Sequence, residues 1–261
     1  MDLQLAGKTA VVTGASRGIG LATVQALVAE GVTVVGAART VSPELAESGA
    51  SAVRVDLATA EGAQHLTGQA LRELGEVDLL VNNVGGHGDD PFAVDVLAID
   101  DAAWQQVFDL TLFSTVRVTR ALLPSLLRQR GAIVNVSSMA ARVPSAAPVS
   151  YSSAKAAVTA FGRALAEQVG PQGVRVNTIS PGPIRTSQLD GPDSDAAKFA
   201  AAAGIDHADL LASLPAKAGI TLGRLGAPGE VAALITYLAS PMAAFVTGTD
   251  VRIDGGTVKS A

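Results

Sequence analysis

The sequence of 261 residues contains no cysteine, which excludes disulfides, thiolate metal sites and a cysteine nucleophile. Aromatic residues make up only 3% of the chain although 48% is hydrophobic, so Ala, Val, Leu and Ile must build the core. Such a composition is typical of buried parallel strands flanked by Ala-rich helices. The histidines, His65, His87 and His207, lack metal-ligand spacing, and we expect no metal site.

Positive charge is also scarce. The formal net charge is −5, and no Lys/Arg cluster falls on any expected element, which argues against nucleic-acid and anionic-membrane partners. No apolar run reaches the roughly 18 residues of a membrane span. The first residues, 1–8, lack the apolar stretch of a signal peptide. We therefore expect a soluble, cytoplasmic protein.

Short apolar runs alternate with helical patterns along the chain. Strands are expected at 9–13, 33–38, 52–55, 77–81, 132–136, 174–179 and 250–253, and helices at 18–30, 43–48, 59–74, 101–129, 150–169 and 229–239. This alternation predicts an α/β Rossmann fold, a doubly wound seven-stranded parallel sheet with helices on both faces. No linker or composition shift divides the chain, so we expect one domain over 1–261.

The segment 187–222 departs from this alternation. It starts with turn-forming residues, continues with weakly helical Ala-rich stretches and contains no expected strand. Long segments of this kind are commonly lids or binding loops. We expect a mobile lid on the substrate side. Its apolar surface, formed by Leu210, Leu211, Leu214 and Ile220, favours a substrate with a sizeable hydrophobic portion.

A glycine-rich turn, TGASRGIG at 13–20, joins the first strand to the first helix. Gly14, Gly18 and Gly20 would let the backbone bend tightly and approach a pyrophosphate at the helix amino terminus. An ordinary tight turn is the alternative when this motif is taken alone.

Further unusual residues follow the other expected strands at their carboxyl ends, where open parallel sheets bind ligands. They are Arg39, Asp56, Asn82 with Asn83, Ser137 with Ser138, and Pro181 with Gly182. Because unrelated turns would not gather at one edge, the sequence predicts a single binding cleft there.

Tyr151 and Lys155 lie four residues apart on one expected helix, which places a cation beside a phenol. Lowering a tyrosine pKa from ~10 to ~7 takes ~4 kcal/mol. An ammonium at about 4 Å supplies on the order of 4 kcal/mol at an effective dielectric of 20. The pair therefore predicts a phenol that exchanges a proton near neutral pH. A packing tyrosine beside a solvated lysine is the alternative for an isolated pair.

Five motifs occur in a fixed order: TGASRGIG (13–20), NNVG (82–85), NVSS (135–138), YSSAK (151–155) and PGPIRT (181–186). This order resembles the short-chain dehydrogenase/reductase family over essentially the whole chain. The resemblance implies that Tyr151 is the proton donor in reduction and the base in oxidation. Lys155 and a nicotinamide ring would lower the tyrosine pKa, and Ser138 would hydrogen-bond the substrate oxygen.

One position departs from the family. The family asparagine that holds a helix kink and a water is replaced by Thr111, a fourth candidate catalytic residue whose hydroxyl could bind that water. The resemblance also implies which residues bind the cofactor. They are Gly14, Ser16, Arg17, Gly18, Ile19, Gly20, Arg39, Thr40, Asp56, Leu57, Asn83, Val84, Gly85, Tyr151, Lys155, Pro181, Gly182, Ile184 and Thr186.

The end of the second expected strand bears on the choice of cofactor. A carboxylate there would bind the ribose 2′-OH of NAD, but this chain has Ala38 and Arg39, with Arg17 in the glycine turn. We expect NADP(H) to be preferred. NAD(H) remains the alternative if Arg39 only stacks on the adenine.

The expected activity is NADPH-dependent reduction of a ketone to a secondary alcohol. Reduction of 3-oxoacyl thioesters, including acyl-carrier-protein substrates, is one version by analogy. One alternative is an NAD(P)-dependent dehydrogenase of a sugar, polyol or steroid alcohol, and another is a non-catalytic dinucleotide sensor. His87, beside the expected cofactor wall, is a candidate for substrate contact.

Apolar residues occupy more than one face of the expected helices 101–129 and 150–169. They include Leu122, Leu126, Val158 and Phe161, more than one sheet face would cover. The family resemblance implies that these helices form a bundle across a two-fold axis and that the last strand meets its copy across another. We expect a homotetramer.

Overall fold

The computed structural model describes residues 2–88 and 95–259, and within these ranges seven strands form one sheet. All neighbouring strands are parallel, in the order β3-β2-β1-β4-β5-β6-β7, which confirms the predicted sheet. The order reverses between β1 and β4, and such a switch point is where open α/β sheets bind ligands. The strands are β1 Thr9–Thr13, β2 Thr33–Ala38, β3 Ser51–Arg54, β4 Leu79–Asn82, β5 Ala132–Val136, β6 Arg175–Pro181 and β7 Asp250–Ile253.

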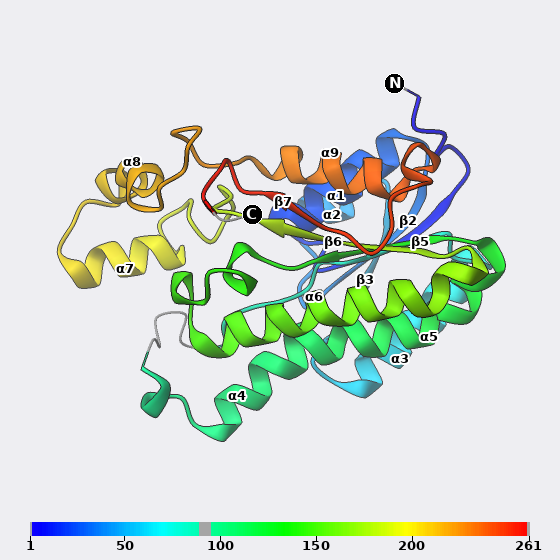
Figure 1. Ribbon diagram of the computed structural model, residues 1–261, viewed down its shortest axis with the longest axis horizontal. Coiled ribbons are helices and arrows are strands. Elements are labelled where there is room, and N and C mark those ends of the chain that lie inside the picture. The colour runs from blue at the N-terminus through cyan, green and yellow to red at the C-terminus, as the bar shows by residue number, and fades with distance from the viewer. Residues whose placement is uncertain (1, 89–94, 260–261) are drawn as a thin grey trace.

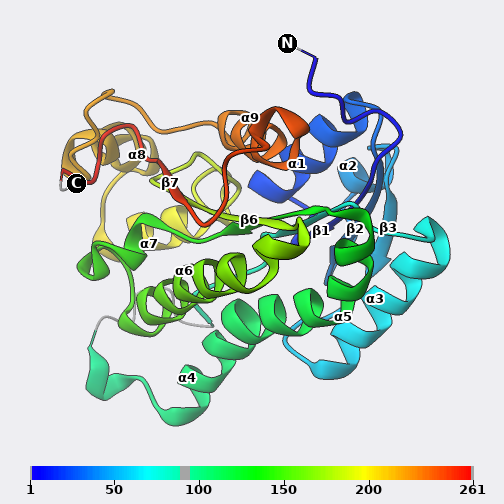
Figure 2. The ribbon, with the colours of Figure 1, turned by 45° about the vertical axis from the view of Figure 1, so that its right-hand side comes forward.

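Helices cover both faces of the sheet (Figures 1 and 2). One face carries α1 Gly18–Ala29, α2 Pro43–Ala46 and α9 Pro228–Ala239, and the other carries α3 Ala60–Leu74, α5 Ser114–Gln129 and α6 Val149–Val169. Successive side chains of a strand point to opposite faces, so Val12 joins the core under α1 and α9 while Val11 joins the core over α3 and α5. Both residues are fully buried.

The expected helix 101–129 is interrupted. It consists of α4 Asp101–Phe108, a π-helical turn Asp109–Phe113 and α5. The Asp109 carboxylate in the turn forms an ion pair with the Arg117 guanidinium, with 2.7 Å between Oδ1 and Nη2. This ion pair ties the turn to α5. A π turn shifts the register of the side chains that follow, and such turns often occur at functional sites. The apolar periodicity of the sequence did not reveal this interruption.

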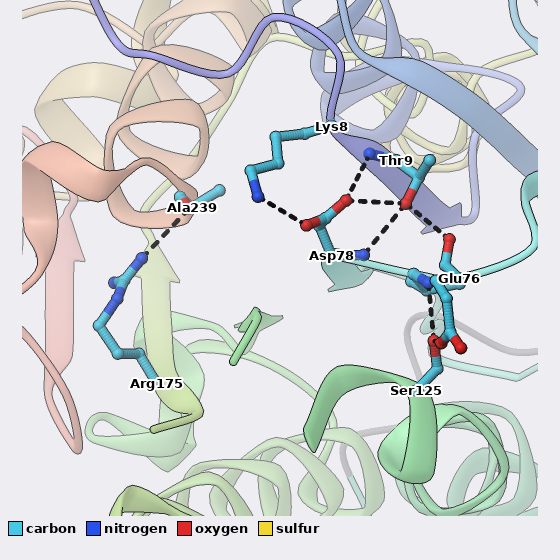
Figure 3. Close-up of polar contacts among 8 residues, drawn as sticks. Lys8, Thr9, Glu76, Asp78, Ser125, Arg175 and Ala239 are labelled. Atoms are coloured by element: carbon cyan, nitrogen blue, oxygen red, sulfur yellow. Dashed lines mark hydrogen bonds and ion pairs between the residues drawn. The ribbon is translucent and has the colours of Figure 1, made fainter. Parts of the chain in front are cut away.

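Polar contacts hold the amino-terminal edge of the sheet, opposite the binding edge (Figure 3). Asp78, just before β4, accepts hydrogen bonds from the Lys8 ammonium at 2.8 Å and from the Thr9 backbone at 3.0 Å. Arg175, at the start of β6, donates to the carbonyl of Ala239 at the end of α9 at 3.1 Å. These contacts fix strand positions without using any predicted site residue.

The segment 187–222 forms two helices, α7 Asp195–Ala203 and α8 His207–Lys217, which lie beyond the carboxyl ends of the strands (Figures 1 and 2). They build a small core of their own around Ala196, Ala200 and Leu210. Leu210 and Ile220 are each only 6% exposed. Leu210 packs in this small core and Ile220 lies against Gly255, so the prediction that these two residues form an apolar surface is wrong.

The apolar residues cited for a tetramer also pack within the chain. Leu122, Leu126 and Val158 are at most 1% exposed, and Phe161 packs against the core formed by α3, α5 and α6. The inference that one sheet face could not cover them is wrong. Among the described residues, no helix is both long and apolar enough to cross a membrane.

Candidate active site and cofactor cleft

A cleft of about 740 Å³ runs along the carboxyl ends of the strands. It brings together most of the predicted site residues from five separate motifs, so these residues do meet in space as expected. Predicted residues that line it are Gly14, Ser16, Arg17, Gly18, Ile19, Arg39, Thr40, Leu57, Asn83, Val84, Gly85, Ser138, Tyr151, Lys155, Pro181, Gly182, Ile184 and Thr186. Gly20, Asp56 and Thr111 do not line it.

The glycine turn needs its glycines for two reasons. Gly14 and Gly18 have φ of 66° and 57°, in the left-handed region that favours glycine. A Cβ on Gly14 would lie 2.8 Å from Asn83 Nδ2, and one on Gly18 would lie 3.2 Å from Thr186 Cγ2. Asn83 Nδ2 donates to the carbonyls of Thr13 and Gly14, at 3.1 and 3.0 Å. Asn83 therefore fixes the turn against the end of β4.

Two predicted cofactor residues have other structural roles. A Cβ on Gly20 would lie 2.0 Å from the Gly14 carbonyl oxygen, so Gly20 allows α1 to pack directly against the turn. Asp56 Oδ1 accepts a hydrogen bond from the Ala58 backbone at 3.0 Å, which shapes the loop between β3 and α3. The neighbouring Leu57 lines the cleft instead.

The end of the cleft beside β2 carries both signs of charge. Arg17 and Arg39 are exposed there. The last residue of β2, next to Arg39, is the small, buried Ala38. Ser42 and Glu44, which the sequence did not identify, also line this end. Glu44 lies in α2 and Ser42 is the N-cap of that helix. The sequence signal that could have found them is the short helix expected directly after the second strand.

Ser138, Tyr151 and Lys155 meet on the wall of the cleft formed by β5 and α6. Ser138 interacts with the Tyr151 phenol closely enough to lower the pKa of that phenol. Lys155 Nζ donates to the Val136 carbonyl at 2.8 Å and lies 5.7 Å from the centre of the Tyr151 ring. The lysine is 3% exposed, so the protein holds a nearly buried ammonium beside the phenol.

Burial dominates the ionisation of the pair. It raises the pKa of Tyr151 to about 12, against a smaller lowering by the hydrogen bond from Ser138. Burial also lowers the pKa of Lys155 to about 8. Desolvation of the phenol thus outweighs an ammonium that points to the Val136 carbonyl. The predicted tyrosine pKa near 7 counted a positive nicotinamide ring as well as Lys155, and it stays a prediction. The phenol is protonated at neutral pH.

Gly85 and Thr111 support the lysine side of the wall. A Cβ on Gly85 would lie only 2.8 Å from Lys155 Nζ, so the lysine occupies the space that a side chain would fill. Thr111, in the π turn, is fully buried, and its Oγ1 accepts a hydrogen bond from the Gly86 backbone at 3.4 Å. Thr111 therefore lies behind the cleft, and its part in a proton relay stays a prediction.

Ser137 and His87 flank the reactive pair. Ser137 Oγ donates to the Lys155 carbonyl at 2.9 Å, a contact within the framework of α6. The His87 ring lies 4.1 Å from the Tyr151 ring, centre to centre, and lines the cleft. In the ranges 2–88 and 95–259, no group of three or more His, Cys, Asp or Glu side chains could hold a metal ion.

The sequence of residues 14–258 matches the family described as enoyl-(acyl carrier protein) reductase. The 3-oxoacyl-(acyl-carrier-protein) reductase FabG of Vibrio harveyi is 33% identical over 97% of this chain and 98% of its own. The short-chain reductase protein NovJ of Streptomyces niveus is 36% identical over 95% and 92%. The chain belongs to the short-chain dehydrogenase/reductase family. This family of oxidoreductases accounts for the order of the five motifs.

A solved member of the short-chain dehydrogenase/reductase family has nearly the same fold. The L-sorbose reductase of Gluconobacter frateurii, in complex with NADPH and L-sorbose, superimposes with a TM-score of 0.91. The two sequences are 32% identical, and the match covers 100% of both chains. The Rossmann-type sheet and its helices are thus those of this family.

Proposed function

We propose that the protein is an NADPH-dependent reductase that converts a ketone to a secondary alcohol, with Tyr151 as the proton donor. The observation that carries the proposal is the meeting of Ser138, Tyr151 and Lys155 in the cleft that the glycine turn opens. A non-catalytic sensor would need the glycine turn but not this group of three side chains.

The three side chains have complementary roles in the proposed reduction. Ser138 Oγ hydrogen-bonds the carbonyl oxygen and orients it toward the phenol. The Tyr151 hydroxyl, protonated at neutral pH because burial raises its pKa, gives its proton to that oxygen. The Lys155 ammonium stabilises the phenolate that remains. NADPH bound in the cleft would supply the hydride for the carbonyl carbon.

The shape and charge of the cleft fit NADPH. Gly14 and Gly18 line the cleft at the amino terminus of α1, where backbone N–H groups would favour the pyrophosphate of the cofactor. Arg17 and Arg39 stand at the adenosine end without a carboxylate at Ala38, so a 2′-phosphate would find two guanidiniums. The L-sorbose reductase holds NADPH, which supports the same cofactor here. Glu44 nearby weakens this preference without reversing the local charge.

The segment 187–222 is proposed to be a lid over the substrate. Its start lines the cleft through Ser187 and Gln188, and its two helices form a separate small core. Backbone hydrogen bonds hold the chain at both ends of this segment. Arg185 N donates to the Gly226 carbonyl at 2.8 Å, and Leu222 N donates to the Gly255 carbonyl at 3.1 Å. These ties leave α7 and α8 to move as one unit.

A homotetramer is also proposed, from exposed apolar side chains outside the helices 101–129 and 150–169. Tyr237, Met242 and Phe245, on α9 and the turn after it, are 36%, 44% and 105% exposed. Large exposed apolar side chains of this kind commonly mark protein contacts. A monomer in sedimentation velocity at micromolar concentration would contradict the proposal.

The test of the function is turnover of a ketone panel with NADPH and, separately, NADH, followed by nicotinamide absorbance. The proposal predicts NADPH oxidation that depends on the ketone, with one alcohol formed per NADPH consumed. Tight NADPH binding without turnover over the whole panel would instead favour the sensor. Oxidation of alcohols with NAD and no reduction of ketones would favour the dehydrogenase.

A further inference from the structure

His87 is placed where it could contact a substrate beside the reacting carbonyl. Its ring lies 4.1 Å from the Tyr151 ring, tilted by 44°, and it lines the cleft. The phenol must approach the carbonyl oxygen to about 3 Å for proton transfer. A hydrogen-bonding group packed against that phenol is therefore close to substrate atoms that neighbour the carbonyl carbon.

The surroundings of His87 favour an uncharged imidazole. Burial lowers the pKa of His87, and the nearby Lys155 ammonium lowers it further, while Asp195 in the first turn of α7 acts in the opposite direction. A neutral imidazole carries one N–H donor and one acceptor nitrogen. An alcohol hydroxyl has the same pair of functions, whereas a carboxylate can only accept.

We propose that His87 is a specificity-determining residue that hydrogen-bonds a hydroxyl on the carbon next to the carbonyl, so that the preferred substrates are α-hydroxy ketones. This inference rests on the proposed reduction. In that reaction the hydride of NADPH adds to the carbonyl carbon, and the Tyr151 proton goes to the oxygen. The C=O bond becomes CH–OH, NADPH becomes NADP⁺, and the neighbouring hydroxyl is unchanged.

The lid side of the cleft is consistent with a polar substrate. Ser187 and Gln188 line it at the start of the lid, whereas Leu210 and Ile220 are buried in the interior. His87 and Tyr151 line the same cleft. An apolar chain would leave these polar groups unpaired, which costs free energy in a site that excludes water.

The experiment compares hydroxyacetone with butanone, which differ by one OH in place of CH₃. The variant His87→Phe keeps a ring against Tyr151 and removes the hydrogen bond. We expect its kcat/KM to fall about ten-fold for hydroxyacetone and by less than about three-fold for butanone, as loss of one hydrogen bond predicts. His87→Gln, which retains a donor and an acceptor, should recover part of the loss for hydroxyacetone.

The control is His65→Phe, on the exposed side of α3. It should leave kcat/KM unchanged for both hydroxyacetone and butanone. An equal loss for both ketones in His87→Phe, or no loss for either, would overturn the role of His87 and leave the reductase assignment intact. If the native protein reduced no member of the broader ketone panel with NADPH, the proposed function would fail and this inference with it. Native turnover of butanone but not hydroxyacetone would overturn the inference alone.

Discussion

Replacing Gly85 by alanine tests how closely the active-site wall is fitted around Lys155. The new Cβ would lie 2.8 Å from Lys155 Nζ and 3.3 Å from its Cε. Ordinary contact starts near 3.4 Å, so Nζ must retreat by about 0.6 Å. The lysine end can move, since it is the flexible part of the side chain, and Gly85 does not have positive φ. The fold should therefore tolerate the change.

The cost of Gly85→Ala should appear in catalysis instead. Retreat of Nζ strains its 2.8 Å hydrogen bond to the Val136 carbonyl, and a hydrogen bond from a charged group contributes about 1.5–3 kcal/mol. We expect kcat to fall about ten- to one-hundred-fold. The assay is steady-state ketone reduction with NADPH, beside thermal unfolding of both proteins.

Gly229→Ala is the matched control, because a Cβ there meets nothing within 4 Å and Gly229 lacks positive φ. It should leave kcat and thermal stability near the native values. Native kcat in Gly85→Ala would refute the reasoning that the position of the ammonium is critical. A large loss of thermal stability in Gly85→Ala would show that the wall, rather than the lysine end, absorbs the clash.

Three further outcomes follow from the site. Arg39→Ala should weaken NADPH binding about ten- to one-hundred-fold and NADH binding little, as measured by fluorescence titration; equal effects on both would contradict an Arg39 contact to the 2′-phosphate. The kcat/KM for reduction should fall as pH rises through about 8, since the free enzyme has its Lys155 ammonium below that pKa and loses it above; a flat profile from pH 7 to 9 would count against the role of the ammonium. Hydrogen exchange in 187–222 should slow when NADPH and product alcohol bind, and unchanged exchange would argue for a static segment rather than a lid.

The sheet could be predicted almost completely from the sequence. The expected strands at 9–13, 33–38, 132–136 and 250–253 have the observed bounds, because buried parallel strands are short apolar runs separated by helical patterns. The motif residues meet in one cleft since the carboxyl ends of parallel strands lie on one edge. Periodicity and topology are sufficient to predict these features.

What the sequence could not supply depends on packing. The π turn around Thr111 does not alter the apolar pattern of 101–129, and the burial of Leu122 and Leu210 depends on how neighbouring helices pack. The desolvation of the Tyr151 phenol is a further effect of packing, because spacing on a helix gives the distance to Lys155 but not the burial of the ring.

The most direct test of the central claim is hydride transfer by Tyr151→Phe, which keeps the ring and removes the acidic proton. With NADPH deuterated at the transferred position, the native protein should place deuterium on the carbinol carbon of the product. The variant should do so at least ~10²-fold more slowly while binding NADPH with nearly native affinity. A variant that retains most of the native rate would contradict Tyr151 as the proton donor, and a native product without deuterium on that carbon would contradict the reductase itself.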